Sequence, residues 1–187
     1  MNHKPKLVII TGQPGSGKST LAKELGKLLY LPVISRDEVK EGYVNTFAIP
    51  HYELPEDTNK VATEIFFRVI ALLLSSNISL IAEAAFQHKT WEPEIARLKN
   101  YADAFIVVCD LDSQTAARRH LERGLRDGKR EFFHGDNRVT HFKKTGEFLA
   151  PENYEPPSIP EVRTVRVSTL NDYDPGLEDL VKEIMRC

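Results

Sequence analysis

The chain has 187 residues, of which 41% are hydrophobic and 28% charged, with a formal net charge of −2. This length suits one globular domain, expected over residues 1–187, and no apolar stretch approaches the roughly 20 residues of a membrane span. The small net charge does not favour nucleic acid as a partner, and we expect a monomer or weak dimer without membrane contact.

The first residues run into an apolar segment after one charged turn. They contain neither the apolar stretch nor the small-residue cleavage site of a secretion signal, so we expect a cytoplasmic protein. The two cysteines agree with this prediction. Cys109 lies inside an apolar run and Cys187 is the last residue, which indicates neither a disulfide framework nor a thiolate metal site.

The strongest motif follows an apolar run at residues 7–10. Residues 12–19 read G-Q-P-G-S-G-K-S, which matches the phosphate-binding loop (P-loop) G-x-x-x-x-G-K-[ST] between a predicted strand and a predicted helix. Backbone N–H groups in such a loop converge on phosphate oxygens, because glycines permit close approach. We therefore predict that ATP and Mg²⁺ bind here. A plain glycine turn before a helix is the weaker alternative.

Two side chains of this loop have expected roles of their own. Lys18 adds a mobile positive charge for the β- and γ-phosphates, and Ser19 can place its hydroxyl on Mg²⁺. The predicted nucleotide contacts in the loop are Gly12, Gln13, Pro14, Gly15, Ser16, Gly17, Lys18, Ser19 and Thr20.

A candidate catalytic carboxylate follows the second predicted strand. A helix over residues 18–30 ends before Pro32, and a short strand at residues 33–34 stops at Asp37. A carboxylate at this strand end can accept the proton of a substrate hydroxyl that attacks the γ-phosphate. We favour this role for Asp37, and the alternative is that it caps the helix that follows.

The third strand ends at a second acidic residue. Residues 46–56 read as a loop and residues 57–76 as a long helix with Val61, Ile65, Val69 and Leu73 in one row. The strand at residues 78–82 then ends at Glu83. In P-loop enzymes an acid at this place orients Mg²⁺, so Glu83 either helps to hold the metal or contacts the substrate.

The positive charges of the chain gather in its middle. After a helix at residues 91–100 and a buried strand at residues 104–109, residues 118–144 hold nine Lys or Arg against four acids. Arg119 and Arg123 share one face of a predicted helix, where they can stack on adenine and bind phosphate oxygens when a lid closes. A solvent-exposed basic helix is the alternative. The roles of further polar residues stay open, namely Arg126, Arg130, His134 and Asp136.

Strands and helices alternate along the chain, with a last strand at residues 164–167 and a last helix after Pro175. This order predicts an α/β fold with a doubly wound parallel five-stranded sheet, as in P-loop NTPases and nucleoside monophosphate kinases. A basic helical lid is expected as an insertion at about residues 113–150. Ligands of such a sheet bind beyond the carboxyl ends of its strands.

Taken together, these segments resemble the small P-loop kinases of the predicted-kinase group. That group includes the kinase domain of bacteriophage polynucleotide kinase, chloramphenicol phosphotransferase and the zeta toxins. Residues 34–38, I-S-R-D-E, look like its strand-two motif, in which the Asp is the catalytic base. The start of the polynucleotide kinase lid, whose arginines bind ATP, is similar to the segment with Asp110 and Asp112 followed by Arg119 and Arg123.

The resemblance implies a kinase but leaves its acceptor open. We favour transfer of the γ-phosphate of ATP to a hydroxyl of a small molecule, with residues 38–60 and 84–92 contacting that acceptor. A nucleotide or polynucleotide 5'-hydroxyl kinase is less favoured, because Lys40 stands where the polynucleotide kinase pattern has an arginine and no phosphatase domain follows. The alternative outside enzymes is an ATP-dependent binding switch.

Overall fold

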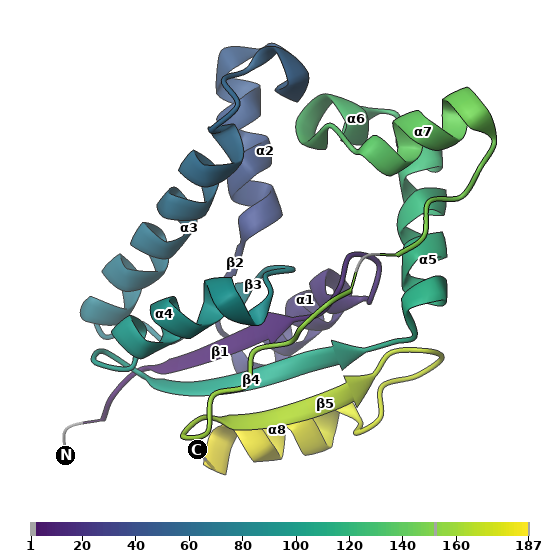
Figure 1. Cartoon of the computed structure of the whole chain (residues 1–187). Coiled ribbons are helices and arrows are strands. Elements are labelled where there is room, and N and C mark those ends of the chain that lie inside the picture. Colours follow the sequence, from purple (N-terminus) through teal and green to yellow (C-terminus); the bar gives the residue numbers. More distant parts are fainter. Residues whose placement is uncertain (1–2, 152, 187) are drawn as a thin grey trace.

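A computed structural model describes residues 3–151 and 153–186 of the chain. Its centre is a sheet of five parallel strands in the order β2-β3-β1-β4-β5, which confirms the predicted fold class (Figure 1). The strands are β1 (Lys6–Thr11), β2 (Val33–Ser35), β3 (Leu80–Glu83), β4 (Asp103–Asp110) and β5 (Arg163–Ser168).

Helices cover both faces of this sheet. One face carries α1 (Lys18–Leu29) and α8 (Leu177–Arg186), whose apolar residues pack with Val8, Ile10 and Val107. The other face carries α3 (Thr58–Ser75) and α4 (His88–Leu98). Because both faces are covered, the inner strands are apolar in nearly every position, as expected of a buried parallel sheet.

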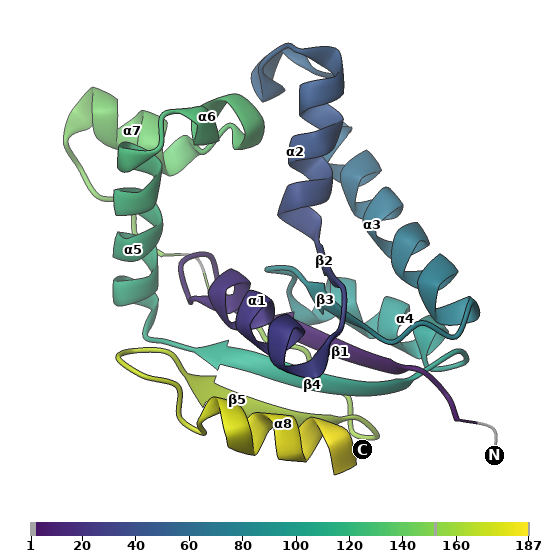
Figure 2. The same cartoon turned by 180° about the vertical axis from the view of Figure 1, so that it is seen from behind.

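Two groups of helices project beyond the carboxyl ends of the strands. One consists of α2 (Arg36–Phe47), the short η1 (His51–Glu53) and the start of α3. The other follows β4 and contains α5 (Ser113–Arg126), α6 (Lys129–His134) and α7 (Asn137–Thr145). Figures 1 and 2 show α6 facing the far end of α2, and α6 contacts both α2 and η1. We call residues 113–145 the lid.

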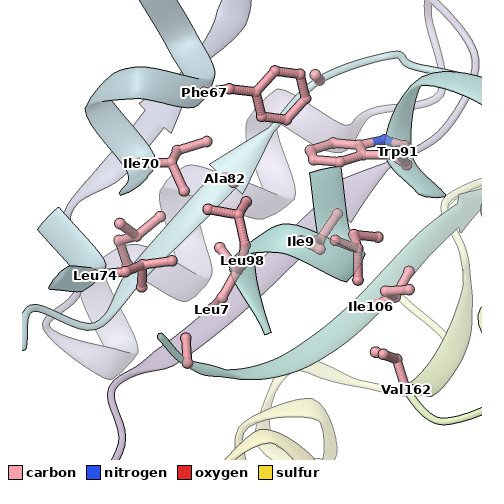
Figure 3. Packing of buried hydrophobic residues seen from close by; sticks show 14 of the residues in the cluster. Leu7, Ile9, Phe67, Ile70, Leu74, Ala82, Trp91, Leu98, Ile106 and Val162 are labelled. Carbon is pink, nitrogen blue, oxygen red and sulfur yellow. The ribbon is translucent and has the colours of Figure 1, made fainter. Parts of the chain in front are cut away.

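The larger core cluster centres on aromatic side chains at one face of the sheet. Phe66, Phe67, Phe86 and Trp91 pack edge to face or stacked, with ring centroids 5.1 to 6.3 Å apart. Leu7 and Ile9 of β1 lie below them, as Figure 3 shows for the labelled members. Such pairs add stability beyond the area that they bury, so this face is rigid.

The apolar row that the sequence shows along α3 is not the most buried face of this helix. Val61, Ile65, Val69 and Leu73 are only partly buried, whereas α3 turns Ala62, Phe66 and Ile70 fully into the core. The helix is apolar around most of its circumference, so periodicity alone does not select the buried face. The position of Trp91 and Phe86 selects it, because the two phenylalanines of α3 pack against them.

The polar stretch after α5 contains two helices that the sequence pattern did not predict. Asp136 caps α7 by accepting a hydrogen bond from the amide of Arg138, and Gly135 and Gly146 end α6 and α7 in left-handed conformations. Both helices are short and lack an apolar row, which is why no helical period marks them. The final helix also begins at Leu177 rather than directly after Pro175.

Cys109 is buried, and burial raises the pKa of its thiol to about 12, so it is not a reactive thiolate. Cys187 lies outside the described residues. Over the part of the chain that the structure describes, no helix is both long and apolar enough to cross a membrane.

Candidate active site

The carboxyl edge of the sheet brings three distant segments together. The P-loop follows β1, Asp37 follows β2, and Glu83 is the last residue of β3. Glu83 pairs in register with Ile10 on one side and with Ser35 on the other. The order β2-β3-β1 therefore places Glu83 between the P-loop and the start of α2.

Tight backbone packing fixes the P-loop. Gly15 has a φ of +88°, and a Cβ built at this position would lie 2.0 Å from the carbonyl oxygen of Ala116 in α5. Only glycine fits there, because a side chain would be strained and would collide with rigid backbone. Gln13 also ties the loop to the end of β4, since its Nε2 donates to the carbonyl of Leu111 at 2.6 Å.

The loop offers unused hydrogen-bond donors. Among the described residues, no acceptor is found for the amides of Gly15, Gly17, Lys18 and Ser19, and the buried hydroxyl of Ser16 has no partner. The start of α1 adds the positive end of a helix dipole. A buried cluster of free donors at a helix start fits a bound phosphate.

Lys18 lies among these free donors of the P-loop, and Thr20 lies at the outer side of the loop. The Lys18 ammonium group donates to the carbonyl of Gln13 at 3.4 Å, and its side chain is almost fully buried. Thr20 is exposed on α1, so only its backbone belongs to the loop. The mobile charge of Lys18 therefore lies beside the free amides, where the β- and γ-phosphates are expected.

Oxygen ligands suited to Mg²⁺ lie next to this cradle. The Ser19 hydroxyl donates to Oε1 of Glu83 at 3.2 Å, and the Ser35 hydroxyl donates to Oε2 at 2.7 Å. Glu83 is 3% exposed and forms no ion pair with any described residue. A buried carboxylate without a cation fits a site for a hard cation. No cage of three or more acidic, His or Cys side chains exists in the described chain, so phosphates and water would complete the shell.

Asp37 is the second residue of α2, so it does not occupy the capping position, which belongs to Ser35. Its carboxyl group is half exposed in the cleft, although many protein atoms surround it. Burial raises the pKa of Asp37, but the nearby charges of His134, Lys18, Arg36 and Arg130 outweigh this and lower it. The carboxylate is therefore ionised at neutral pH.

One cleft of about 480 Å³ brings together five of the predicted site residues, namely Pro14, Lys18, Ser19, Asp37 and Arg123. The residues that line it are Pro14, Lys18, Ser19, Arg36, Asp37, Lys40, Asn59, Ala85, His120, Arg123, Arg130, His134 and Asp136. Three of the lid residues whose roles the sequence left open, Arg130, His134 and Asp136, thus face the same space as Asp37. Arg126 does not, because its side chain is exposed and bonds to the backbone of Glu122.

Arg119 and Arg123 have different surroundings although they share a helix. Arg123 lines the cleft, whereas the Arg119 guanidinium donates to the carbonyls of Thr169 at 2.9 Å and Leu170 at 2.6 Å. The Thr169 hydroxyl in turn donates to the carbonyl of Ser16. Arg119 thus ties the lid to the loop after β5, beside the P-loop and outside the cleft lining.

A contact between two partly buried side chains orients the lower part of the lid. His120 in α5 contacts the carboxylate of Asp136, and Arg123 lies 3.4 Å from the other ring nitrogen of His120. Burial raises the pKa of Asp136, but hydrogen bonding to His120 and the amide of Arg138 lower it to about 2. The pair holds α7 against α5 and keeps Arg123 at the cleft.

Sequence reasoning assigned no role to Arg36, and it placed Lys40 and Asn59 only within the broad acceptor range 38–60 without identifying either as a cleft residue. Arg36 and Lys40 flank Asp37 on the same helix, and residues three or four apart share a helix face. This spacing would have indicated both once α2 was known to begin at Arg36. Asn59 had no such signal, because it reaches the cleft only through the placement of α3.

Residues 7–144 match the model of a family of AAA domains (AAA_33). A presumed kinase from Chloroflexus aurantiacus j-10-fl has a similar structure over 100% of this chain and 97% of its own, with a TM-score of 0.74 and 21% identity. The APS kinase CysC of Mycobacterium tuberculosis, in complex with AMPPNP and APS, is 18% identical, with a TM-score of 0.58 and coverage of 98% and 97%.

A chain of the Pnkp1/Rnl/Hen1 RNA repair complex is 22% identical, with a TM-score of 0.58 over 86% of this chain and 51% of that one. No curated protein matches the sequence. At these identities the solved structures establish a shared fold, that of the P-loop kinase group.

Proposed function

Because the chain belongs to the AAA domain family AAA_33 and shares the fold of P-loop kinases, we propose that it is an ATP-dependent kinase of small molecules. It would transfer the γ-phosphate of ATP to a hydroxyl of its acceptor in the cytoplasm. One observation carries this proposal: the ionised carboxylate of Asp37 lines the same cleft as Lys18 and Ser19 of the P-loop.

The P-loop supplies the proposed nucleotide site. The free amides of Gly15, Gly17, Lys18 and Ser19 and the ammonium group of Lys18 would bind the phosphates, and Arg119 would lie near the adenine base at the loop after β5. Ser19 and Glu83 would hold Mg²⁺, which supplies positive charge to the phosphate oxygens. The structure of APS kinase contains the ATP analogue AMPPNP, and this supports the proposal that a nucleotide binds in this fold.

The chemical step that we propose depends on two side chains of the cleft. Asp37 accepts the proton of the acceptor hydroxyl, which it can do at neutral pH because it is ionised there. Arg123 places a fixed guanidinium at the cleft from the lid side, where it can stabilise negative charge on the transferred group. Closure of the lid over these groups excludes water, which favours transfer over hydrolysis.

Two other functions predict different products. A polynucleotide kinase is suggested by the likeness to the RNA repair complex, but the net charge of −2 gives a strand of nucleic acid little general attraction. A binding switch would need no carboxylate aimed at an acceptor. The place of Asp37 therefore favours a kinase over a switch, and the net charge favours a small-molecule acceptor over a polynucleotide.

The test is transfer of label from [γ-³²P]ATP. The protein is incubated with hydroxyl-bearing metabolites, antibiotics, nucleosides and oligonucleotides, and labelled products are separated from free phosphate. We expect one class of small molecules to become labelled, and the variant Lys18→Ala to lose all label transfer because the triphosphate is no longer held. Release of phosphate alone, stimulated by a protein partner, would show a switch instead.

A further inference from the structure

Asp37 lies between two sets of positive charges. Lys18 is one of the charges that lower the pKa of Asp37, and Lys18 belongs to the phosphate side of the cleft. Lys40 lies about one turn further along α2 than Asp37, away from the carboxyl edge of the sheet, and its ammonium group contacts the lid at the carbonyl of His134. An acceptor whose hydroxyl meets Asp37 would extend its remaining atoms toward Lys40.

Lys40 is a buried ammonium group without a carboxylate partner. It is 2% exposed, and its Nζ lies 3.2 Å from the carbonyl oxygen of His134 and 3.5 Å from Nε2 of His51. No Asp or Glu of the described chain forms an ion pair with it. Burial and the charge of Arg36 lower the pKa of Lys40 to about 8, against the opposing effect of Asp37. A buried charge of this kind is costly unless a ligand compensates it.

Two guanidinium groups line the same cleft as Lys40. Arg36 donates to the backbone and side-chain oxygens of Asn59, but its Nε is buried and has no partner in the described chain. Arg130 of α6 lines the cleft, and no described residue forms an ion pair with its guanidinium. Arg123 lines the same cleft, and the charge of Asp37 acts on both arginines.

We infer that the acceptor carries an anionic group, a carboxylate or a phosphate, and that Lys40 of α2 and Arg130 of the lid bind this group between them, with Arg36 beside it. This inference rests on the proposed kinase function. Asp37 and Lys40 are three residues apart on one helix face, so the anionic group would lie close to the hydroxyl that is phosphorylated. The acceptor itself then holds the lid against α2.

The binding step can be tested without catalysis. The protein is saturated with AMPPNP and Mg²⁺, which occupy the P-loop, and sodium sulfate is titrated against sodium chloride at equal ionic strength while the melting temperature is recorded. We expect sulfate to raise the melting temperature of the wild type, and Lys40→Met to need about tenfold more sulfate for the same shift. Lys27→Met, an exposed lysine of α1 outside the cleft, is the matched control.

The turnover step uses matched pairs of acceptors, each a neutral polyol and its anionic counterpart: glycerol and glycerate, an aldose and its aldonic acid, adenosine and adenosine 3'-monophosphate. We expect phosphorylation of an anionic member, and the pairs distinguish a carboxylate from a phosphate. In Lys40→Met the KM of that acceptor should rise about tenfold while the KM of ATP stays unchanged.

The pH dependence of this KM distinguishes a lysine that binds the acceptor from one with a merely structural role, because a structural lysine would not change the KM with pH. With a pKa of about 8, Lys40 loses its proton as the pH rises, so the KM of the anionic acceptor should rise about tenfold between pH 7 and pH 9. The groups that face Lys40 are Arg36, Asp37, His51 and His134, and the pKa values of Asp37, His51 and His134 are all lowered from ordinary values that already lie below this range. Lys40→Met should remove the dependence.

Clear outcomes separate this inference from the kinase proposal. The anion site is overturned if a neutral acceptor is phosphorylated as fast as its anionic counterpart. It is also overturned if sulfate raises the melting temperature equally in the wild type, Lys40→Met and Arg130→Gln. Arg130→Gln keeps this test valid if the buried Lys40 substitution does not fold. Sulfate binding that depends on Lys40, without label transfer to any acceptor, overturns the kinase proposal and leaves the anion site standing.

Discussion

The ammonium group of Lys40 in α2 donates to the carbonyl oxygen of His134 in the lid helix α6, at 3.2 Å. The His134 side chain reaches back to α2, where its Nε2 donates to Oε1 of Glu41 at 2.8 Å. Gly135 follows so closely that a Cβ would lie 2.7 Å from the ring of His51. The lid thus docks on the acceptor side of the cleft, and its position and the shape of the acceptor site depend on each other.

Docking of the lid should weaken in acid. Burial lowers the pKa of His134 below its ordinary 6.5, and Asp37 and Glu41 oppose this only in part. The docked state therefore binds fewer protons than the open state, so docking is fully favourable above 6.5 and is lost as the pH falls toward the lower pKa of the docked state. Hydrogen exchange of residues 129–134, corrected for intrinsic rates, should be faster at about pH 5.5 than at about pH 7.5.

The control for this prediction is His134→Gln, which can still donate to Glu41 but does not titrate. Its hydrogen exchange should lose the dependence on pH. Equal protection of α6 in the wild type at both pH values would contradict a role of His134 in docking.

Removal of the Asp37 carboxylate should abolish phosphate transfer without weakening nucleotide binding. We expect Asp37→Asn to lower kcat by about 10² to 10⁴, because the acceptor hydroxyl loses its proton acceptor. The Kd of AMPPNP, measured by calorimetry, should stay the same. Glu38→Gln is the matched control, since Glu38 pairs with Lys23 and does not line the cleft. A kcat of Asp37→Asn equal to that of Glu38→Gln would refute the assignment.

Ser19→Ala should weaken metal binding specifically. The hydroxyl of Ser19 lies beside the buried carboxylate of Glu83, and its loss removes one oxygen ligand of the proposed Mg²⁺ site. The Mg²⁺ concentration that half-saturates AMPPNP binding should rise about tenfold or more. Ser75→Ala, at the far end of α3, should leave it unchanged. The proposed site fails this test if both variants need the same Mg²⁺ concentration for half-saturation of AMPPNP binding.

Gly15→Ala should destabilise the whole protein. Its positive φ and the close carbonyl of Ala116 predict a loss of about 2 kcal/mol or more in the free energy of unfolding, measured in urea. Gly42→Ala is the contrasting variant, because nothing lies within 4 Å of a Cβ there and α2 continues through it. That change should stabilise the protein by about 1 kcal/mol. An unaltered stability of Gly15→Ala would show that the loop adapts.

The sequence predicted the P-loop and the sheet well because both depend on local chemistry. Gly15 and Lys18 belong to one octapeptide whose residue spacing is typical of a P-loop backbone. The apolar runs around Leu7 and Ile106 indicate buried strands whatever their place in the sheet. It predicted the helices of the lid poorly. The two short helices α6 and α7 are held by Asp136, His120 and Glu41, which are contacts between segments and leave no period in the sequence.

By itself, then, the sequence determined the phosphate-binding loop, the order of strands and helices, and the acids Asp37 and Glu83 that follow the second and third strands, because these depend on neighbouring residues. Only the tertiary structure decided which of those groups share a cleft. It brought Arg130 and His134 across to Asp37, placed Lys40 in a buried position without a carboxylate, and turned Arg119 away to the loop after β5. Charges act through distance in space, and folding sets that distance.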